Sequence, residues 1–303
     1  MPSVLLPFPD DMRLAAAVAT QVGARLGRLE WHHFPDGESL ITMDEDIADA
    51  DVVLFVSLKQ PDQKALPLRF AAQTARQLGA RSVGLVAPYL AYMRQDTRFH
   101  AGESISAPVF ARFLEESVDW LVTVDPHLHR IASLGSIFRI PATAISSAPS
   151  LADWIRREVS RPLLIGPDSE SAQWVAEVAR DAHAPYEVLH KVRRGDRDVE
   201  VSLPNAEHLR GYTPVLVDDI VSSGATLVKT LEHLGKIGMP PAVCVVIHPI
   251  FAGDSWACLQ SAGAGRTVST DSIAHPSNGI SLATPIARAV AERLTRDPHE
   301  VAS

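Results

Sequence analysis

The chain has few cysteines, no long apolar run and no basic stretch at its amino terminus. Its two cysteines, Cys244 and Cys258, are too far apart for a Cys-x-x-Cys motif, which favours buried thiols in a reducing compartment over a disulfide framework or a redox pair. No apolar run approaches the roughly 20 residues of a membrane-spanning helix. Asp10 and Asp11 interrupt the apolar start, so a signal peptide is not indicated. We expect a cytoplasmic protein without membrane contact.

Positive charge is also in short supply. The formal net charge is −8 and the pI is about 5.8, which argues against a general nucleic-acid binder. An anionic ligand would therefore have to be held by local basic residues. The 303 residues exceed the roughly 100–150 of a typical domain, so we expect two domains.

Short β-rich runs alternate with longer helical patterns along the whole chain. This alternation predicts parallel sheets with ligands at the carboxyl ends of the strands. Strands are expected at Val4–Phe8, Val52–Leu58, Ser82–Ala87, Trp120–Val124, Pro162–Gly166, Thr213–Val217 and Ala242–His248. Helices are expected at Ala65–Leu78, Ser106–Glu116, Leu151–Val159, Ser171–Ala182 and Ala225–Ile237, with another capped by Asp10 and Asp11. The Pro/Ala/Ser-rich stretch at Ile140–Pro149 suggests a domain boundary, and the similar halves suggest structural duplication.

The most informative segment is Pro214–Leu227. An apolar strand is followed by Asp218 and Asp219 and then by a loop of small residues that opens a helix. Small residues let the backbone approach a ligand closely, and N–H groups at a helix start favour a phosphate. The two carboxylates suit sugar hydroxyls or a hard cation. Further hydroxyls come from Ser222, Ser223 and Thr226. The segment predicts a site for a phosphorylated sugar rather than a solvated turn.

Two segments of the first half carry weaker signals. Phe34-Pro35-Asp36-Gly37-Glu38 combines an aromatic face with carboxylates and suits adenine, although an ordinary β-turn would account for it as well. Arg94-Gln95-Asp96 follows a strand, and the Arg94 guanidinium could bind phosphate oxygens, but a charged surface loop is an equal alternative.

Three further segments follow expected strands. Asp125-Pro126-His127 could supply a metal ligand, against the simpler alternative of a surface histidine. Gly166-Pro167-Asp168 repeats the strand-end carboxylate in the second half. The cation-rich segment His190–Asp198 is expected to be a mobile loop that brings Lys191 and Arg193 onto a polyphosphate, unless it is only a charged hairpin tip.

Taken together and in this order, these segments resemble those of ribose-phosphate diphosphokinases, also called phosphoribosyl-diphosphate synthetases. The resemblance runs from about Phe34 to Thr270 and beyond, and it includes His248-Pro249 and Thr270-Asp271-Ser272-Ile273. Type I phosphoribosyltransferases share only the sugar-phosphate loop. The resemblance implies an α/β fold with two phosphoribosyltransferase-type domains, each a mainly parallel sheet flanked by helices. We place these domains at residues 1–145 and 146–285, with a C-terminal helix in 286–303 that packs back on the first domain.

The resemblance also implies transfer of the diphosphoryl group of ATP to C1 of ribose 5-phosphate, with Mg²⁺. ATP would be held by Phe34, Asp36, Gly37, Glu38, Arg94, Gln95 and Asp96, with the Phe34 turn reaching across a subunit contact. Ribose 5-phosphate would be held by Arg193, Asp218, Asp219, Ser222, Ser223, Gly224, Ala225 and Thr226. His127 and Asp168 would serve the metal, and Lys191 and Arg193 would be catalytic. We expect self-association, at least to a dimer and up to a tetramer or hexamer.

The chain departs from the family pattern at Glu170, where many members have glycine, and at Ser222-Ser223, where many have Asp-Thr. The segment Thr97–Glu103 lacks the basic run of many regulated members, which puts control by ADP and phosphate in doubt. Two alternatives stay open: a phosphoribosyltransferase that consumes the diphosphate product, and a non-catalytic regulatory relative.

Overall fold

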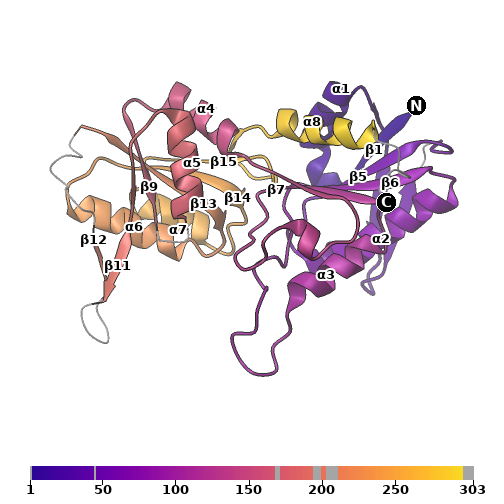
Figure 1. Ribbon diagram of the computed structural model, residues 1–303, viewed down its shortest axis with the longest axis horizontal. Coiled ribbons are helices and arrows are strands. Elements are labelled where there is room, and N and C mark those ends of the chain that lie inside the picture. Colours follow the sequence, from indigo (N-terminus) through magenta and orange to yellow (C-terminus); the bar gives the residue numbers. More distant parts are fainter. Residues whose placement is uncertain (1, 44–45, 168–170, 194–198, 203–210, 296–303) are drawn as a thin grey trace. The chain divides into compact units, whose positions relative to one another are not determined.

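The structure is a computed structural model that describes residues 2–43, 46–167, 171–193, 199–202 and 211–295 (Figure 1). The chain divides into two compact units. The first comprises Met1–Ser146, Ser272–Ala274 and Leu282–Ser303, and the second comprises Ser147–Asp271 and His275–Ser281. These units are groups of residues that contact one another more than the rest of the chain. The expected domain boundaries at 145/146 and 285/286 stay a prediction.

The first unit is built on a parallel sheet with the strand order β2-β1-β5-β6-β7-β8. Every residue of β5, β6 and β7 is buried, as expected for parallel strands with helices on both faces. The strands are β1 (Ser3–Pro7), β2 (Arg25–Leu26), β5 (Asp51–Phe55), β6 (Ser82–Ala87), β7 (Trp120–Val124) and β8 (Ala142–Ile145). The α/β architecture predicted from the alternation is confirmed.

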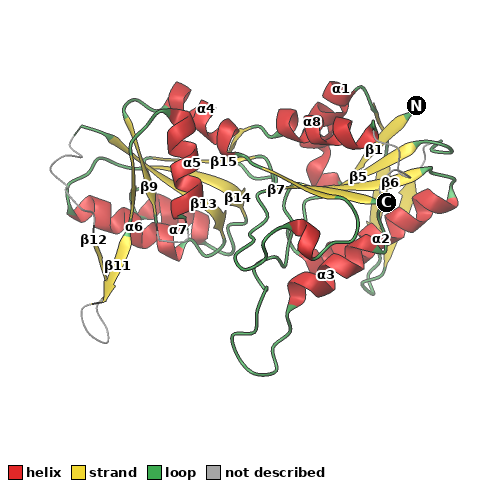
Figure 2. Ribbon diagram, viewed as in Figure 1, coloured by secondary structure: helices red, strands yellow, loops and turns green. Residues whose placement is uncertain are grey.

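Helices cover both faces of this sheet, with α1 and α8 on one face and α2 and α3 on the other (Figures 1 and 2). Alternate strand side chains, such as Val53, Phe55, Val122 and Val124, pack with α1 and α8 in one apolar core. The helices and 3₁₀ turns are η1 (Pro9–Asp11), α1 (Met12–Val22), α2 (Pro61–Gln77), α3 (Ser106–Glu115), η2 (Leu134–Ser136) and α8 (Ala283–Leu294). The last helix of the chain thus belongs to the first unit.

The second unit repeats the same arrangement, with the strand order β10-β9-β13-β14-β15-β16, all parallel. One core lies under α4 and α5, and the other lies under α6 and α7. The strands are β9 (Pro162–Gly166), β10 (Tyr186–Val188), β13 (Thr213–Val221), β14 (Val243–Pro249), β15 (Arg266–Thr270) and β16 (Asn278–Ile280). The helices are α4 (Ala148–Glu158), α5 (Ala172–Ala182), α6 (Ala225–Lys236) and α7 (Ser255–Ser261).

Two antiparallel strand pairs lie outside the β–α alternation, and a hairpin was one of the two alternatives for the segment His190–Asp198. The first pairs β3 (Leu29–His33) with β4 (Ser39–Met43), and the second pairs β11 (His190–Arg193) with β12 (Val199–Ser202). The expected mobile loop therefore begins as a strand, because its residues find ladder partners on β12. Most of β3 and the first two residues of β4 are not buried, so no apolar run marked this hairpin in the sequence.

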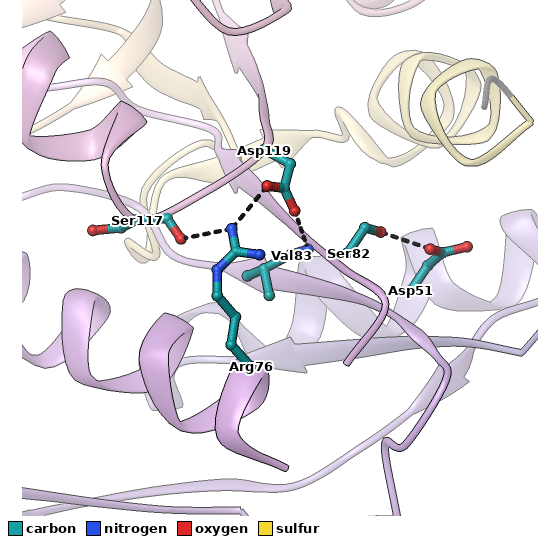
Figure 3. A network of polar contacts seen from close by, with 6 residues as sticks. All are labelled: Asp51, Arg76, Ser82, Val83, Ser117 and Asp119. Atoms are coloured by element: carbon teal, nitrogen blue, oxygen red, sulfur yellow. Dashed lines mark hydrogen bonds and ion pairs between the residues drawn. The ribbon is translucent and has the colours of Figure 1, made fainter. Parts of the chain in front are cut away.

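A polar network fixes the amino ends of the first sheet, opposite the carboxyl ends at which α/β sheets generally bind ligands (Figure 3). Arg76 on α2 donates to Asp119 Oδ1 at 2.8 Å, and Asp119 Oδ2 accepts from the backbone N–H of Val83 at 2.7 Å. The hydroxyl of Ser82 donates to Asp51 Oδ1 at 2.6 Å. The network ties β5, β6 and α2 together, and its role is structural.

Candidate active site

The Phe34–Glu38 segment forms the tip of the β3–β4 hairpin. The backbone N–H of Phe34 donates to the Glu38 carbonyl at 2.8 Å, and Gly37 turns the chain with a φ of 92°. The N–H of Glu38 donates to the Asp36 carboxylate at 3.2 Å. Phe34 is 40% exposed and forms an edge contact with His32 at 4.6 Å between ring centroids. The tip is thus a true β-turn that also presents an aromatic face to its surroundings.

Arg94 and Gln95 lie in the loop after the carboxyl end of β6, and both are exposed. Buried Met93 anchors this loop, and the N–H of Gln95 donates to the Tyr92 carbonyl at 3.0 Å. Tyr92 has a φ of 67°, which is costly for a residue with a side chain. Its hydroxyl donates to Asp62 on α2, and this hydrogen bond raises the Tyr92 pKa to about 12.

Asp96 has a partner within the chain. Its carboxylate accepts from the Arg130 backbone N–H at 2.7 Å and from the Arg130 guanidinium at 3.1 Å, and its side chain is fully buried. Burial alone would raise the pKa of this carboxyl, but the hydrogen bonds and charge of Arg130 hold it below its usual value. Asp96 therefore ties the loop after β6, which carries Arg94 and Gln95, to the loop after β7, which carries His127.

His127 follows β7, the neighbour of β6 in the sheet. It is half-buried, and Asp125 just before it has a φ of 34°, held by a hydrogen bond from its N–H to the Ile145 carbonyl at 3.0 Å. Non-glycine residues in this backbone region cluster at functional sites. The structure thus brings Arg94, Gln95, Asp96 and His127 to one edge of the first sheet.

The second unit carries the sugar-phosphate loop at the carboxyl end of β13. We expected this strand to end at Val217, but it continues to Val221, because Asp218, Ile220 and Val221 still pair with β14. Asp218 and Asp219 are therefore held by the sheet, and both are half-buried. Asp219 Oδ1 accepts from the Ile220 N–H at 2.8 Å. A fixed backbone at this point presents both carboxylates in a defined direction.

The loop opens α6 through Gly224, whose φ of 70° places the N-terminal cap in the left-handed region. Gly224 has no side chain to cap the helix, and the N–H groups at such a helix start suit an anion. A local bond from the Ala225 N–H to Ser223 Oγ is long, at 3.5 Å. Ser223 and Ala225 are exposed, and Ser222 and Thr226 are partly exposed.

Lys191 and Arg193 lie on β11, where only the course of the backbone is described. Asp168 and Glu170 lie in residues 168–170, outside the described residues, and so does the expected hairpin tip at residues 194–198. The structure therefore adds no geometry to the expected roles of these side chains.

Sequence reasoning missed the segment that packs behind the sugar-phosphate loop. The N–H of Phe251 donates to the Val221 carbonyl at 2.8 Å, and that of Ala252 donates to the Ser222 carbonyl at 3.0 Å. A signal existed in His248-Pro249, which marks the end of β14, the strand beside β13.

Cys244 lies on that strand too, and burial raises the pKa of its thiol to about 12, which makes it an inert core residue.

The described residues contain no cluster of three or more His, Cys, Asp or Glu side chains that could hold a metal ion. Mg²⁺ does not need such a cluster, since it commonly binds through one or two carboxylates together with waters and substrate phosphates. The half-buried carboxylates Asp218 and Asp219, just before the start of α6, fit that partial ligand set.

Comparisons with known proteins agree with this geometry. The family model described as the N-terminal domain of ribose phosphate pyrophosphokinase matches residues 4–117, and that of the phosphoribosyl transferase domain matches residues 133–256. Within the described part of the chain, every helix is too short or too polar to cross a bilayer.

Relatives of the chain cover nearly its whole length. A ribose-phosphate pyrophosphokinase of Halobacterium salinarum is 32% identical over 290 residues, covering 95% of this chain and 100% of the relative. One of Methanopyrus kandleri is 31% identical over 290 residues, covering 95% and 98%. A phosphoribosylpyrophosphate synthetase structure from Mycobacterium smegmatis shares the fold, with a TM-score of 0.83 at 21% identity and coverage of 97% and 100%. The chain therefore belongs to the ribose-phosphate pyrophosphokinase family.

Proposed function

We propose that the chain transfers the diphosphoryl group of ATP to the C1 hydroxyl of ribose 5-phosphate, giving 5-phosphoribosyl 1-diphosphate and AMP. The observation that carries this proposal is the loop after β13. Its two strand-end carboxylates and its uncapped helix start suit a sugar phosphate. The exposed Arg94–Gln95 pair and the Phe34 turn supply the nucleotide side, which a phosphoribosyltransferase acting on the diphosphate would not need.

Each part of the sugar substrate has a proposed partner in the loop after β13. Asp218 and Asp219 accept from the ribose hydroxyls, and the N–H groups and hydroxyls from Ser222 to Thr226 hold the 5-phosphate. The left-handed conformation of Gly224 turns the chain from this loop into α6. Positioning of this kind lowers the barrier, since phosphoryl-type transfer depends mainly on alignment and charge neutralisation.

On the nucleotide side, Phe34 stacks on adenine while Asp36, Gly37 and Glu38 bind its edge. Arg94 and Gln95 bind the phosphates, and Asp96 holds their loop in place through Arg130. Lys191 and Arg193 stabilise the charge that develops on the transferring group.

Enzymes of this family need a metal, and we propose Mg²⁺. By the family resemblance, His127 and Asp168 would supply its protein ligands. When bound, the ion neutralises phosphate charge and orients the phosphate oxygens.

We further propose that the chain works in the cytoplasm as a homo-oligomer. Large apolar side chains lie exposed on the first unit, among them Phe99 at 64%, Val109 at 66% and Leu66 at 51%. Exposed apolar groups of this size favour burial against another protein surface.

The test is AMP release from ATP in the presence and absence of ribose 5-phosphate and Mg²⁺, with identification of the product. We expect AMP only when both are present, and an Asp218→Asn variant should release far less. Diphosphate release from 5-phosphoribosyl 1-diphosphate and a base, without AMP formation, would instead favour a phosphoribosyltransferase. Absence of both reactions would favour a regulatory relative.

A further inference from the structure

Three aromatic rings pack together behind the sugar-phosphate loop. Phe251 lies 5.0 Å from Trp256 and 4.6 Å from His275, and Trp256 lies 4.9 Å from His275, between ring centroids. They come from three different places in the second unit: the loop after β14, the helix α7 and the loop after β15. We call these three residues the aromatic cluster.

The cluster is joined to the loop by two backbone hydrogen bonds. Phe251 donates to the Val221 carbonyl and Ala252 donates to the Ser222 carbonyl, at 2.8 and 3.0 Å. These acceptors are the last residue of β13 and the first residue of the loop. A shift of Phe251 would therefore move the start of the loop with it.

Phe251 has a φ of 42°, a backbone conformation that residues with side chains seldom adopt. Such a conformation persists only where surrounding contacts hold it. Phe251 is buried and packs against Trp256 and His275, so the two rings supply that constraint.

His275 is itself fixed by a chain of hydrogen bonds. The N–H of Ser277 donates to His275 Nδ1 at 3.1 Å, and Ser277 Oγ lies 2.7 Å from the same nitrogen. Ser277 Oγ also lies 2.7 Å from Ser269 Oγ, which accepts from Asn278 Nδ2 at 3.0 Å. These contacts hold the imidazole in one orientation.

The helix that carries Trp256 also supports Gly224. A Cβ on Gly224 would lie 3.6 Å from Ser255 Cβ and 3.8 Å from Leu259 Cγ, both on α7. The loop is thus held at both ends, by Phe251 and Ala252 at Val221–Ser222 and by α7 at Gly224.

We propose that the aromatic cluster positions the sugar-phosphate loop and thereby sets the affinity for ribose 5-phosphate. Its residues are positioning residues, since they act through the backbone of Val221 and Ser222. The proposal rests on the function given above, because it assumes that this loop binds the sugar phosphate.

The test compares Trp256→Ala with Trp256→Phe, which keeps an aromatic ring. For Trp256→Ala we expect the KM for ribose 5-phosphate to rise about 10- to 100-fold, since small misplacements of binding groups have effects of that size. The KM for ATP and kcat should stay within about threefold, because Trp256 belongs to the second unit and the nucleotide residues belong to the first. Trp256→Phe should restore most of the affinity. Equal rises in both KM values, or no rise in a folded Trp256→Ala variant, would overturn the proposal.

Direct titration with ribose 5-phosphate alone separates this proposal from the proposed function. If the wild type neither binds the sugar phosphate nor releases AMP, the function fails. If the wild type binds it and Trp256→Ala binds it equally well, only the positioning role fails.

Should Trp256→Ala not fold, Ser277→Ala is the second variant. It releases the His275 ring without emptying the core, and the same selective loss of affinity is expected; unchanged affinity there would overturn the proposal.

Discussion

Backbone conformations that disfavour side chains occur at the carboxyl edges of both sheets. Tyr92 and Asp125 have φ values of 67° and 34° in the first unit, and Gly224 and Phe251 have values of 70° and 42° in the second. Each lies in or beside a segment assigned to a substrate or to the metal. Because every non-glycine case costs free energy, the surrounding contacts must hold it, and the result is a binding surface that is shaped before the ligand arrives.

Gly224 offers a direct test of that shaping. Gly224→Ala places no atom closer than 3.6 Å to a neighbour, so its effect comes from the backbone conformation alone. We expect the KM for ribose 5-phosphate to rise about tenfold, with a much smaller change for ATP. Gly238→Ala is the matched control, since Gly238 has a φ of 75° and open space around it. The assignment of the loop would be wrong if both variants changed the two KM values alike.

Lys191 tests the catalytic assignment. Lys191→Ala should lower kcat about 100-fold or more while the affinity for ribose 5-phosphate changes little, because a cation that meets charge only in the transition state acts on turnover. Steady-state kinetics at saturating Mg²⁺ measure both quantities. Glu200→Ala, on the paired strand β12 opposite Val192, serves as the control for damage to the hairpin. Turnover near that of the wild type in Lys191→Ala would rule out a catalytic role.

At the scale of elements, the two units share a strand order, but their corresponding loops differ. In the second unit Gly224 opens α6, and in the first unit Gln60 opens α2 with the same left-handed cap at a φ of 56°. In the first unit, side chains of the chain itself bind the backbone of the corresponding loop. The Asp11 carboxylate accepts from the Ser57 N–H at 2.9 Å, and Lys64 Nζ donates to the Ser57 carbonyl at 2.8 Å. An internal carboxylate thus occupies an N–H group that a phosphate could use.

Burial of the Asp11 carboxyl makes the free energy of unfolding depend on pH. Burial raises the pKa of Asp11 from 3.8 to about 6, although the Ser57 N–H and the charge of Lys64 oppose the shift. A raised carboxyl pKa stabilises the fold below about pH 4, and that contribution is lost as pH rises through 6. It amounts to about 3 kcal/mol at 1.4 kcal/mol per unit. We expect the difference in unfolding free energy between the wild type and Asp11→Asn to change by about this amount between pH 4 and 7, measured by urea denaturation. A difference independent of pH would contradict the buried, raised carboxyl.

The sequence predicted the bounds of several buried strands well, and it did so for a physical reason. β6, β7 and β9 have the bounds expected from their apolar runs, because a strand buried on both faces needs nearly continuous apolar residues. The end of β13 was placed four residues early, since two carboxylates look like a strand end until their pairing with β14 is known. Asp11 was expected to cap a helix, but its side chain makes no cap and turns to Ser57 instead.

Residues of the candidate site could be predicted only where the side chain itself suits a ligand, as a carboxylate, a guanidinium or an imidazole does. Asp218, Arg94 and His127 were found in this way, and the structure places each at a carboxyl edge. Phe251, Trp256 and His275 come from three separate segments and contact each other only after folding. Their apolar and aromatic character is that of ordinary core residues, so no local pattern indicated their position behind the loop.

At the scale of the whole molecule, the nucleotide and sugar residues belong to different units. The Phe34 turn lies on an exposed hairpin of the first unit, whereas Asp218 and Gly224 lie in the second. The family resemblance implies that this turn serves the site of a neighbouring subunit. Closed symmetric assemblies are the usual form of soluble oligomers, so we expect the active form to be at least a dimer.

Subunit mixing tests this shared site. One inactive variant carries Phe34→Ala with Glu38→Ala, and the other carries Lys191→Ala. If the turn acts across the interface, mixed oligomers contain sites with an intact turn from one chain and an intact lysine from the other, so AMP release should recover in part. Mixing each variant with itself is the control, and exchange is checked by labelling the two chains with different fluorophores. If the labels exchange and no activity returns, the turn serves its own chain. Recovery would show that the exposed aromatic tip of the hairpin works as a part of the neighbouring active site, which explains why Phe34 can remain uncovered within its own subunit.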